Sequence, residues 1–211
     1  MTFVIAIDGH AASGKGTIGK GVAKHFGFSY LDTGLIYRAV AKLGLLTGKA
    51  PLPKKDLIDL ARSFKLEDLE LEDLRSDEVG TYASQIATVA EVRSELFNFQ
   101  RNFALKSKGA VLDGRDIGTV IIPDAQLKVF VTADLSVRAE RRYGDIKRRV
   151  NKVNYDKVLA DLSKRDRLDS SREHAPLKIT SDAHLIDTSE LSIEASIAYV
   201  IDLVDRVKAK N

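Results

Sequence analysis

The sequence has no cysteine, and it has only four prolines and 14 glycines in 211 residues. Without cysteine, a disulfide scaffold, a thiolate zinc site, an iron–sulfur cluster and a cysteine nucleophile are all excluded. No apolar run approaches the roughly 18 to 20 residues needed to cross a bilayer, and the N-terminal segment carries no basic leader. We therefore expect a cytoplasmic protein that folds as one compact domain rather than a linker-rich or disordered chain.

Positive charge is concentrated in one part of the chain. Residues 138–172 hold twelve Lys and Arg against six Asp and Glu, so the rest of the chain is net negative although the whole carries +3. Such a segment suits nucleic acid, an acidic membrane or a small phosphorylated ligand. On charge alone, a solvated helix face with paired charges is the plainer interpretation.

Short apolar runs alternate with helical patterns along the chain. The predicted strands are residues 2–8, 28–31, 109–113, 127–131 and 183–187, and helices are expected from Thr17 to Phe26 and from Leu35 to Leu46. Residues 52–108 are mostly helical in pattern, with an acidic patch at 67–78. This order predicts an α/β fold with a five-stranded, mostly parallel sheet flanked by helices and a ligand beyond the carboxyl ends of the strands.

A phosphate-binding loop is predicted between the first strand and the first helix. Residues 9–15, GHAASGK, match G-x-x-x-x-G-K, in which glycines turn backbone N–H groups toward one anion and the lysine contacts terminal phosphates. The expected ATP-binding residues here are Gly9, His10, Ala11, Ala12, Ser13, Gly14, Lys15, Gly16 and Thr17.

Two positions in this loop leave alternatives open. The residue after Lys15 is Gly16 instead of the usual Ser or Thr, so we expect Mg²⁺ to be held mainly by phosphate oxygens and water. The ring of His10 either approaches phosphate or, as we favour, packs against the protein. The remaining histidines show no spacing typical of a metal cluster.

Three further motifs identify a family. They are YLDTGLIYR at 30–38, LDGRDIGT at 112–119, and RDRLD at 165–169 with Arg172 and APL at 175–177. Together with the GKGT ending of the phosphate loop, they resemble the bacterial cytidylate kinases among the nucleoside monophosphate kinases, over nearly the whole chain. The resemblance implies transfer of the γ-phosphoryl group of ATP to CMP or dCMP, with Mg²⁺, to give CDP or dCDP and ADP.

The resemblance also implies a domain plan. A single P-loop kinase domain would comprise core segments at 1–51, 109–140 and 156–211, a nucleoside monophosphate-binding insertion at 52–108, and a lid at 141–155. The insertion is shorter than in longer members of the family. We expect a monomer with no nucleic-acid or membrane partner.

Site residues follow from the same motifs. The implied catalytic residues are Lys15, Arg115, Asp116 and Arg141, and Arg141 and Arg142 are the lid arginines expected at the donor phosphates. The implied CMP-binding residues are Thr33, Arg38, Ser84, Arg93, Asp113, Arg115, Asp116, Arg165, Asp169 and Arg172. Thr17 and Asp113 are the expected metal-site residues, Asp113 acting through water or else capping a turn, and Asp116 could instead hold Arg115 in place.

These residue types suit phosphoryl transfer to a phosphate. The acceptor is already anionic, so no strong general base is needed, and catalysis rests on positioning and on positive charge around two polyanions. Arginine binds phosphate bidentately. Arginine donors at positions 93 and 172 suit N3 or O2 of cytosine, and Ser84 can accept from its amino group, so CMP and dCMP are predicted over UMP.

Three other functions remain as alternatives at this point. Another P-loop small-molecule kinase, with a different nucleoside monophosphate or a shikimate-like acceptor, would share the loop but not the LDGRDIGT block. A nucleotide-dependent switch would normally carry an Asn-Lys-x-Asp segment, which the sequence lacks. A nucleic-acid-binding module would need more aromatic residues than Tyr143 and Tyr155 in the basic stretch.

Overall fold

The computed structural model describes residues 2–150 and 152–209. Its sheet has five strands in the order β2-β3-β1-β4-β5, and every neighbouring pair is parallel. The strands are β1 (Phe3–Gly9), β2 (Ser29–Asp32), β3 (Gly109–Gly114), β4 (Leu127–Thr132) and β5 (His184–Asp187). The predicted α/β class and the five predicted strands are confirmed, with the sheet parallel throughout.

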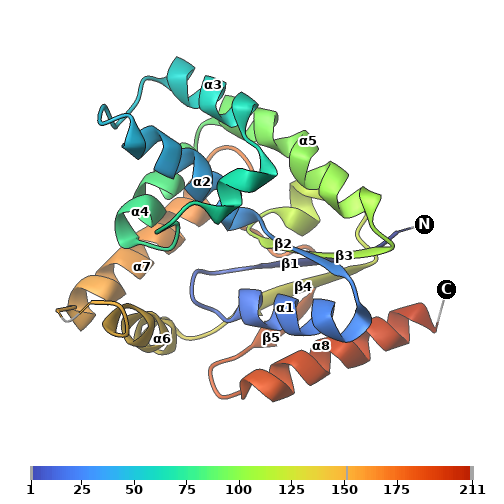
Figure 1. The fold of residues 1–211 in the computed structure, drawn as a ribbon. Helices are drawn as coiled ribbons and strands as arrows, with labels where there is room; N and C mark the ends of the chain where they lie inside the picture. The colour runs from blue at the N-terminus through green and yellow to red at the C-terminus, as the bar shows by residue number, and fades with distance from the viewer. Residues whose placement is uncertain (1, 151, 210–211) are drawn as a thin grey trace.

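Alternating strand residues pack on two separate cores. Val4 and Ala6 of β1 belong to the larger core, whereas Ile5 and Ile7 belong to the other, because successive side chains of a strand point to opposite faces. Figure 1 shows α1 (Lys15–Phe26) and α8 (Ile193–Lys208) lying together on one face of the sheet. Helices α2 (Thr33–Leu46) and α5 (Ala90–Lys106) pack on the opposite side.

Two helices begin earlier than the sequence pattern predicted. Helix α1 starts at Lys15 instead of Thr17, directly after Gly14, which adopts a left-handed conformation with φ 89°. Helix α2 starts at Thr33 instead of Leu35, because Asp32 still has extended backbone geometry. Both corrections bring a functional motif into the first turn of a helix, where backbone N–H groups have no partner within the helix.

The predicted insertion at 52–108 is helical, as expected. It contains α3 (Lys54–Ser63), the 3₁₀ turn η1 (Leu66–Glu70), α4 (Asp77–Ile86) and α5. The acidic stretch at 67–78 forms η1, a loop and the start of α4, whose cap Ser76 accepts a hydrogen bond from Val79 N. Residues 52–108 are all described and hold no strand.

Two helices frame the predicted lid. Helix α6 (Leu135–Lys147) runs past position 141 without a break, and α7 (Tyr155–Ser171) begins at the lid's far end. The two helices pack against each other around Ala139, Val158 and Leu162, which also contact Ala11 of the phosphate loop. In the part of the chain that the structure describes, no helix is long and apolar enough to span a membrane.

Candidate active site

The loop between β1 and α1 is shaped by left-handed backbone at defined positions. Gly9, Ala12 and Gly14 have φ of 151°, 59° and 89°. A Cβ at Gly9 would lie 2.0 Å from Val131 O, so only glycine fits there. Helix α1 has no side-chain cap, and its N-terminal N–H groups therefore point into the loop, as an anion-binding site requires.

Side chains from distant elements hold the carbonyl groups of this loop. Ser13 O accepts from the Thr188 hydroxyl at 2.9 Å, and Ala11 O accepts from Arg138 at 3.3 Å. Lys15 Nζ donates to His10 O at 3.3 Å. With its carbonyls bound behind it, the loop presents its N–H groups to the cleft. Thr188 and Arg138 lie outside the motifs from which the site was predicted.

The ring of His10 packs on the protein, as favoured from the sequence. It lies 5.9 Å from the Phe130 ring in an edge-to-face arrangement. Burial lowers the pKa of His10, which keeps the imidazole neutral against the apolar ring. His10 therefore contributes its backbone to the loop.

Lys15 is half-buried beside other charges of the cleft. Burial and the nearby Arg115 lower the pKa of Lys15 to about 8. Burial and Asp32 raise the pKa of Asp113 to about 6. The carboxylate of Asp113 accepts a hydrogen bond from the Tyr30 hydroxyl and caps no turn, because Asp113 lies within β3. Tyr30 begins the YLDTGLIYR motif but was not among the expected site residues.

The glycine after Lys15 has a steric explanation. A Cβ at Gly16 would lie 3.3 Å from Asp113 Oδ2 and 3.4 Å from the Tyr30 hydroxyl, so this pair fills the space of a longer side chain. Thr17 is exposed and lines the same cleft. Among the described residues no group of three or more Asp, Glu or His could hold a metal by itself. Asp113, Asp32 and Thr17 instead suit a cation that keeps most of its water and phosphate ligands.

The expected phosphate-binding arginines lie on the far side of the cleft. Arg38 donates to Leu74 O at 2.7 Å and to Ser76 O at 3.1 Å. Burial and Arg165 lower the pKa of Arg38 to about 9, and burial and Arg115 lower the pKa of Arg165 to about 10. These cations raise the free energy of one another's charged forms.

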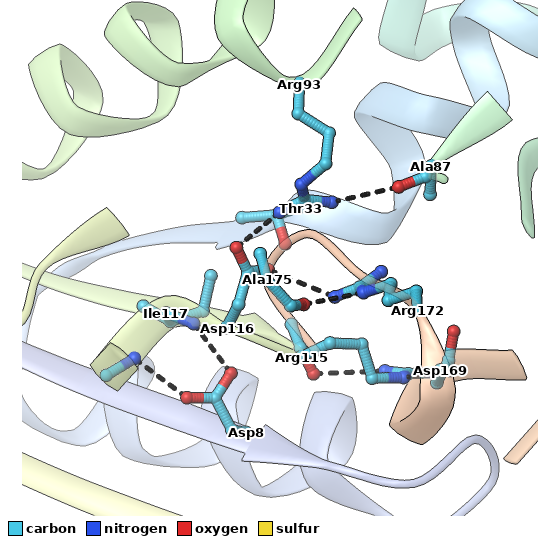
Figure 2. Close-up of polar contacts among 12 residues, drawn as sticks. Asp8, Thr33, Ala87, Arg93, Arg115, Asp116, Ile117, Asp169, Arg172 and Ala175 are labelled. Carbon is cyan, nitrogen blue, oxygen red and sulfur yellow. Dashed lines mark hydrogen bonds and ion pairs between the residues drawn. The ribbon is translucent and has the colours of Figure 1, made fainter. Parts of the chain in front are cut away.

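The role suggested as an alternative for Asp116, holding Arg115, is wrong. Arg115 Nε donates instead to Asp169 Oδ2 at 2.7 Å (Figure 2). Asp116 points away from this pair and binds Arg93, with Arg172 at 3.7 Å from its other oxygen. Arg115 and Asp116 directly follow β3, and their side chains have different partners: Asp169 for Arg115, and Arg93 and Arg172 for Asp116.

The Arg93, Asp116 and Arg172 group is the most buried charged cluster expected to contact the acceptor. Their exposed fractions are 8%, 5% and 8%. Arg93 also donates to Ala87 O at 3.4 Å and Arg172 Nε to Ala175 O at 2.6 Å, so both guanidinium groups are fixed (Figure 2).

Two hydroxyl residues expected to contact the acceptor are bonded within the protein. The Ser84 hydroxyl donates to Gly80 O at 3.0 Å and the Thr33 hydroxyl donates to Asp113 O at 2.8 Å. Each keeps lone pairs that can accept from a ligand. Both residues line the cleft.

The lid arginines are differently placed. Arg141 donates to the hydroxyl and carbonyl oxygens of Thr188 at 2.9 and 2.6 Å, which links it to the phosphate loop. Arg142 binds Asp77 of α4 and Arg75 O. Both arginines line the cleft, and only Arg141 is connected to the loop in this structure.

One cleft of about 600 Å³ is lined by all of the expected site residues except Gly9, His10 and Ser13. It runs from the phosphate loop past Lys15 and Arg115 to Arg93 and Arg172, and another part is lined by the exposed apolar side chains Leu191 and Ile193. Residues from the core, the insertion and the α6–α7 region face it. A strand, phosphate loop and helix joined to a second, arginine-lined compartment define a P-loop phosphotransferase.

Comparison with known proteins identifies the family. The cytidylate kinase model matches residues 5–206, and the chain belongs to this family. A cytidylate kinase of Azorhizobium caulinodans is 49% identical over 97% of this chain and 99% of its own. One of Rhodopseudomonas palustris is 49% identical over 98% of this chain and 97% of its own, and one of Cereibacter sphaeroides is 48% identical over 100% and 98%.

Solved structures share the fold at low sequence identity. An uncharacterized protein from Eubacterium ventriosum superposes with a TM-score of 0.58 at 16% identity, covering 97% of this chain and 99% of that one. A shikimate kinase from Bacteroides thetaiotaomicron superposes with a TM-score of 0.51 at 14% identity, covering 96% and 98%. The predicted kinase fold is thereby confirmed. The family assignment favours cytidylate kinase over the shikimate-like and switch alternatives.

Proposed function

We propose that the protein transfers the γ-phosphoryl group of ATP to CMP or dCMP, giving CDP or dCDP and ADP. The observation that carries this proposal is the single cleft joining the phosphate loop to the buried Arg93, Asp116 and Arg172 group. The phosphate-loop end suits a polyphosphate, and the end with the arginines suits a polar base. Residues of both ends line the same cleft, as an in-line transfer between two bound nucleotides requires.

Positive charge is the main catalytic resource of this cleft. Lys15, Arg38, Arg115 and Arg165 are half-buried in one cleft, and the lowered pKa values of Lys15, Arg38 and Arg165 reflect desolvation and mutual repulsion. The buried Nε of Arg165 has no hydrogen-bond partner within residues 2–150 and 152–209. Two substrate phosphates would relieve this repulsion. The cations would stabilise the transition state most, because negative charge spreads over the transferred group there.

The donor would lie along the phosphate loop and α1. Its phosphates would accept from the loop N–H groups and Lys15, and its base would lie against the apolar side chains of Leu191 and Ile193. Mg²⁺ would neutralise charge on the donor phosphates. Thr17 and Asp113 are the residues that would hold it, Asp113 through water.

The acceptor base would meet fixed arginine donors. Arg93 and Arg172 are held by Asp116 and by backbone carbonyls, so their remaining N–H groups have defined directions. Cytosine presents acceptors at N3 and O2, whereas uracil presents a donor at N3 that would face an arginine unpaired. Arg165 and Asp169 would lie near the acceptor sugar.

The basic stretch has partners within the protein. Arg138 pairs with Asp166 at 2.7 Å, and Arg142 and Arg148 pair with Asp77 and Asp145. These pairs leave less free charge for nucleic acid or an anionic membrane, and Arg141 and Arg142 line the cleft in which a small phosphorylated ligand would bind. We propose a monomer, with cytoplasmic nucleotides as its substrates and therefore a cytoplasmic location.

A parallel acceptor assay tests the function. ADP formation from ATP and Mg²⁺ is measured with CMP, dCMP, UMP, AMP and no acceptor. We expect fast turnover with CMP and dCMP, at least about tenfold lower efficiency with UMP, since a buried group is left unpaired, and very little with AMP. Equal efficiency with UMP would contradict the proposed base contacts, and turnover that needs no acceptor would contradict the proposed transfer.

The Lys15→Met variant tests the phosphate loop in the same assay. Removing this cation is expected to lower turnover by about 10²-fold or more. Lys24→Met is the matched control, because Lys24 is an exposed residue of the same helix outside the cleft. Similar turnover in both variants would show that Lys15 does not contact the transferred group.

A further inference from the structure

Asp8 is a buried carboxylate that the motif analysis left unassigned. It is 6% exposed and lies in β1 immediately before Gly9, where the phosphate loop begins. Its two oxygens accept from the backbone N–H groups of Ile117 and Gly118, each at 2.8 Å (Figure 2). A buried carboxylate is costly unless such donors compensate it. The contact joins residues 109 and 110 positions apart.

These two N–H groups begin the π-helical turn η2 (Ile117–Ile121). The residue preceding the turn is Asp116, with non-helical φ of −145° and ψ of 24°, and its side chain makes no capping hydrogen bond. An aspartate at this position normally accepts from N–H groups of the first turn. Here Asp8 accepts from them instead, across the sheet.

The consequence concerns Asp116. Because Asp8 satisfies the turn, the Asp116 carboxylate is left to bind Arg93 and to face Arg172 at 3.7 Å. Figure 2 shows the two aspartates on either side of the turn, one bonded to its backbone and the other directed at the arginines. The glycine at 118 lets the turn lie close to these side chains, because a Cβ there would lie 3.1 Å from Lys128 Cδ and 3.4 Å from Asp8 Oδ2.

We propose that Asp8 is a positioning residue for base recognition: by capping η2 from β1 it leaves Asp116 free to orient Arg93 and Arg172, and it ties that group to the start of the phosphate loop. This inference rests on the proposed function, because base discrimination is its readout. Asp8 itself contacts no substrate in this account. It acts through Asp116.

Asp8→Asn is the first test. Asparagine keeps the shape but replaces one acceptor oxygen with an N–H donor, so one backbone N–H loses its partner and draws Asp116 toward the turn. We expect kcat/KM for CMP to fall about tenfold, with a lower CMP-to-UMP preference. ATP affinity in the absence of acceptor should change less than about twofold. Amide hydrogen exchange at Ile117 or Gly118 should become faster.

A mutant cycle separates positioning from general destabilisation. If Asp8 acts through Asp116, the CMP-to-UMP preference of Asp8→Asn/Asp116→Asn should equal that of Asp116→Asn alone. Additive losses would overturn the proposal. Val204→Ala, in the core on α8 away from the cleft, controls for a comparable drop in Tm, and its CMP-to-UMP preference should match that of the wild type.

A second variant covers a folding failure of Asp8→Asn. Asp8→Ser replaces the carboxylate with a short hydroxyl group and, unlike asparagine, places no amide N–H opposite the turn. The same loss of base preference is expected. Unchanged preference in a folded Asp8→Ser protein would overturn the proposal while leaving the cytidylate kinase function intact. A wild-type protein without CMP-dependent turnover would overturn the proposed function, and the Asp8 proposal with it.

Discussion

At the scale of single residues, the cleft is organised by which carboxylate holds which arginine. Asp169 holds Arg115, whereas Asp116 holds Arg93 and faces Arg172. The motifs predicted that these five residues share a site. They did not predict the pairing, because only the tertiary fold brings Arg93 of α5, Asp169 of α7 and Arg172 to the segment that follows β3.

The buried Asp8 carboxylate gives a pH dependence of stability. Burial raises its pKa to about 6, and the charged groups facing it are Arg115 and Asp116 on the segment after β3, with Lys128 of β4 packed against Gly118. A carboxyl group whose folded-state pKa is raised stabilises the fold at low pH and loses this contribution as pH rises through 6.

We therefore expect the free energy of unfolding of the wild type, relative to Asp8→Asn, to rise by about 1 to 3 kcal/mol between pH 7 and pH 4. Urea unfolding of both proteins at several pH values measures this difference. Because the asparagine does not titrate, a difference that stays constant with pH would show that Asp8 does not have a raised pKa.

At the scale of elements, a buried ion pair joins the helices on either side of the predicted lid. Arg138 of α6 and Asp166 of α7 lie 2.7 Å apart with side chains 6% and 17% exposed. Arg138 also donates to Ala133 O at 2.8 Å and to Ala11 O. The base of the lid is thereby connected to the phosphate loop.

Breaking this pair should be costly. Arg138→Met would leave Asp166 without its cation, and we expect the free energy of unfolding to fall by about 3 to 5 kcal/mol. Arg138→Met/Asp166→Asn should recover part of the loss. Arg206→Met is the control, because its pair with Asp202 is exposed and should contribute less than about 1 kcal/mol. Equal losses in the two single variants, measured by urea unfolding, would argue against a structural role for the buried pair.

At the scale of the whole molecule, residues 74–77 connect the core, the insertion and α6. Arg38 of α2 donates to Leu74 O and Ser76 O, and Arg75 pairs with Asp32 at 3.0 Å. Arg142 of α6 binds Asp77. Residues 74–77 therefore contact both Arg38, which is expected at the acceptor phosphate, and Arg142, which is expected at the donor phosphates.

Two variants can separate the two roles of Arg142, which are its ion pair with Asp77 and its expected contact with the donor phosphates. Its pair with Asp77 is partly exposed, so Asp77→Ala should change stability by less than about 1 kcal/mol and retain turnover. Arg142→Ala should lower turnover with CMP by about 10²-fold, because a cation at the phosphates is lost. Steady-state kinetics of both variants decide the matter, and equally small effects would indicate that Arg142 only bridges the two segments.

Local pattern was sufficient for the elements and for the phosphate loop. The alternation of apolar residues placed five strands within about a residue of their positions, and the GHAASGK segment lies between β1 and α1 as predicted. The helix starts at Lys15 and Thr33 were missed by two residues, since a left-handed Gly14 and an extended Asp32 decide them.

The sequence by itself determined the fold class, the phosphate loop and the family motifs, because these depend on residues close together in the chain. Only the tertiary structure decided that Asp8 caps η2, that Tyr30 binds Asp113, and that Thr188 and Arg138 hold the loop carbonyls. These contacts join residues 83 to 175 positions apart. They exist because the register of β1 against β3 and β4 places the ends of the strands together, and no local pattern fixes that register.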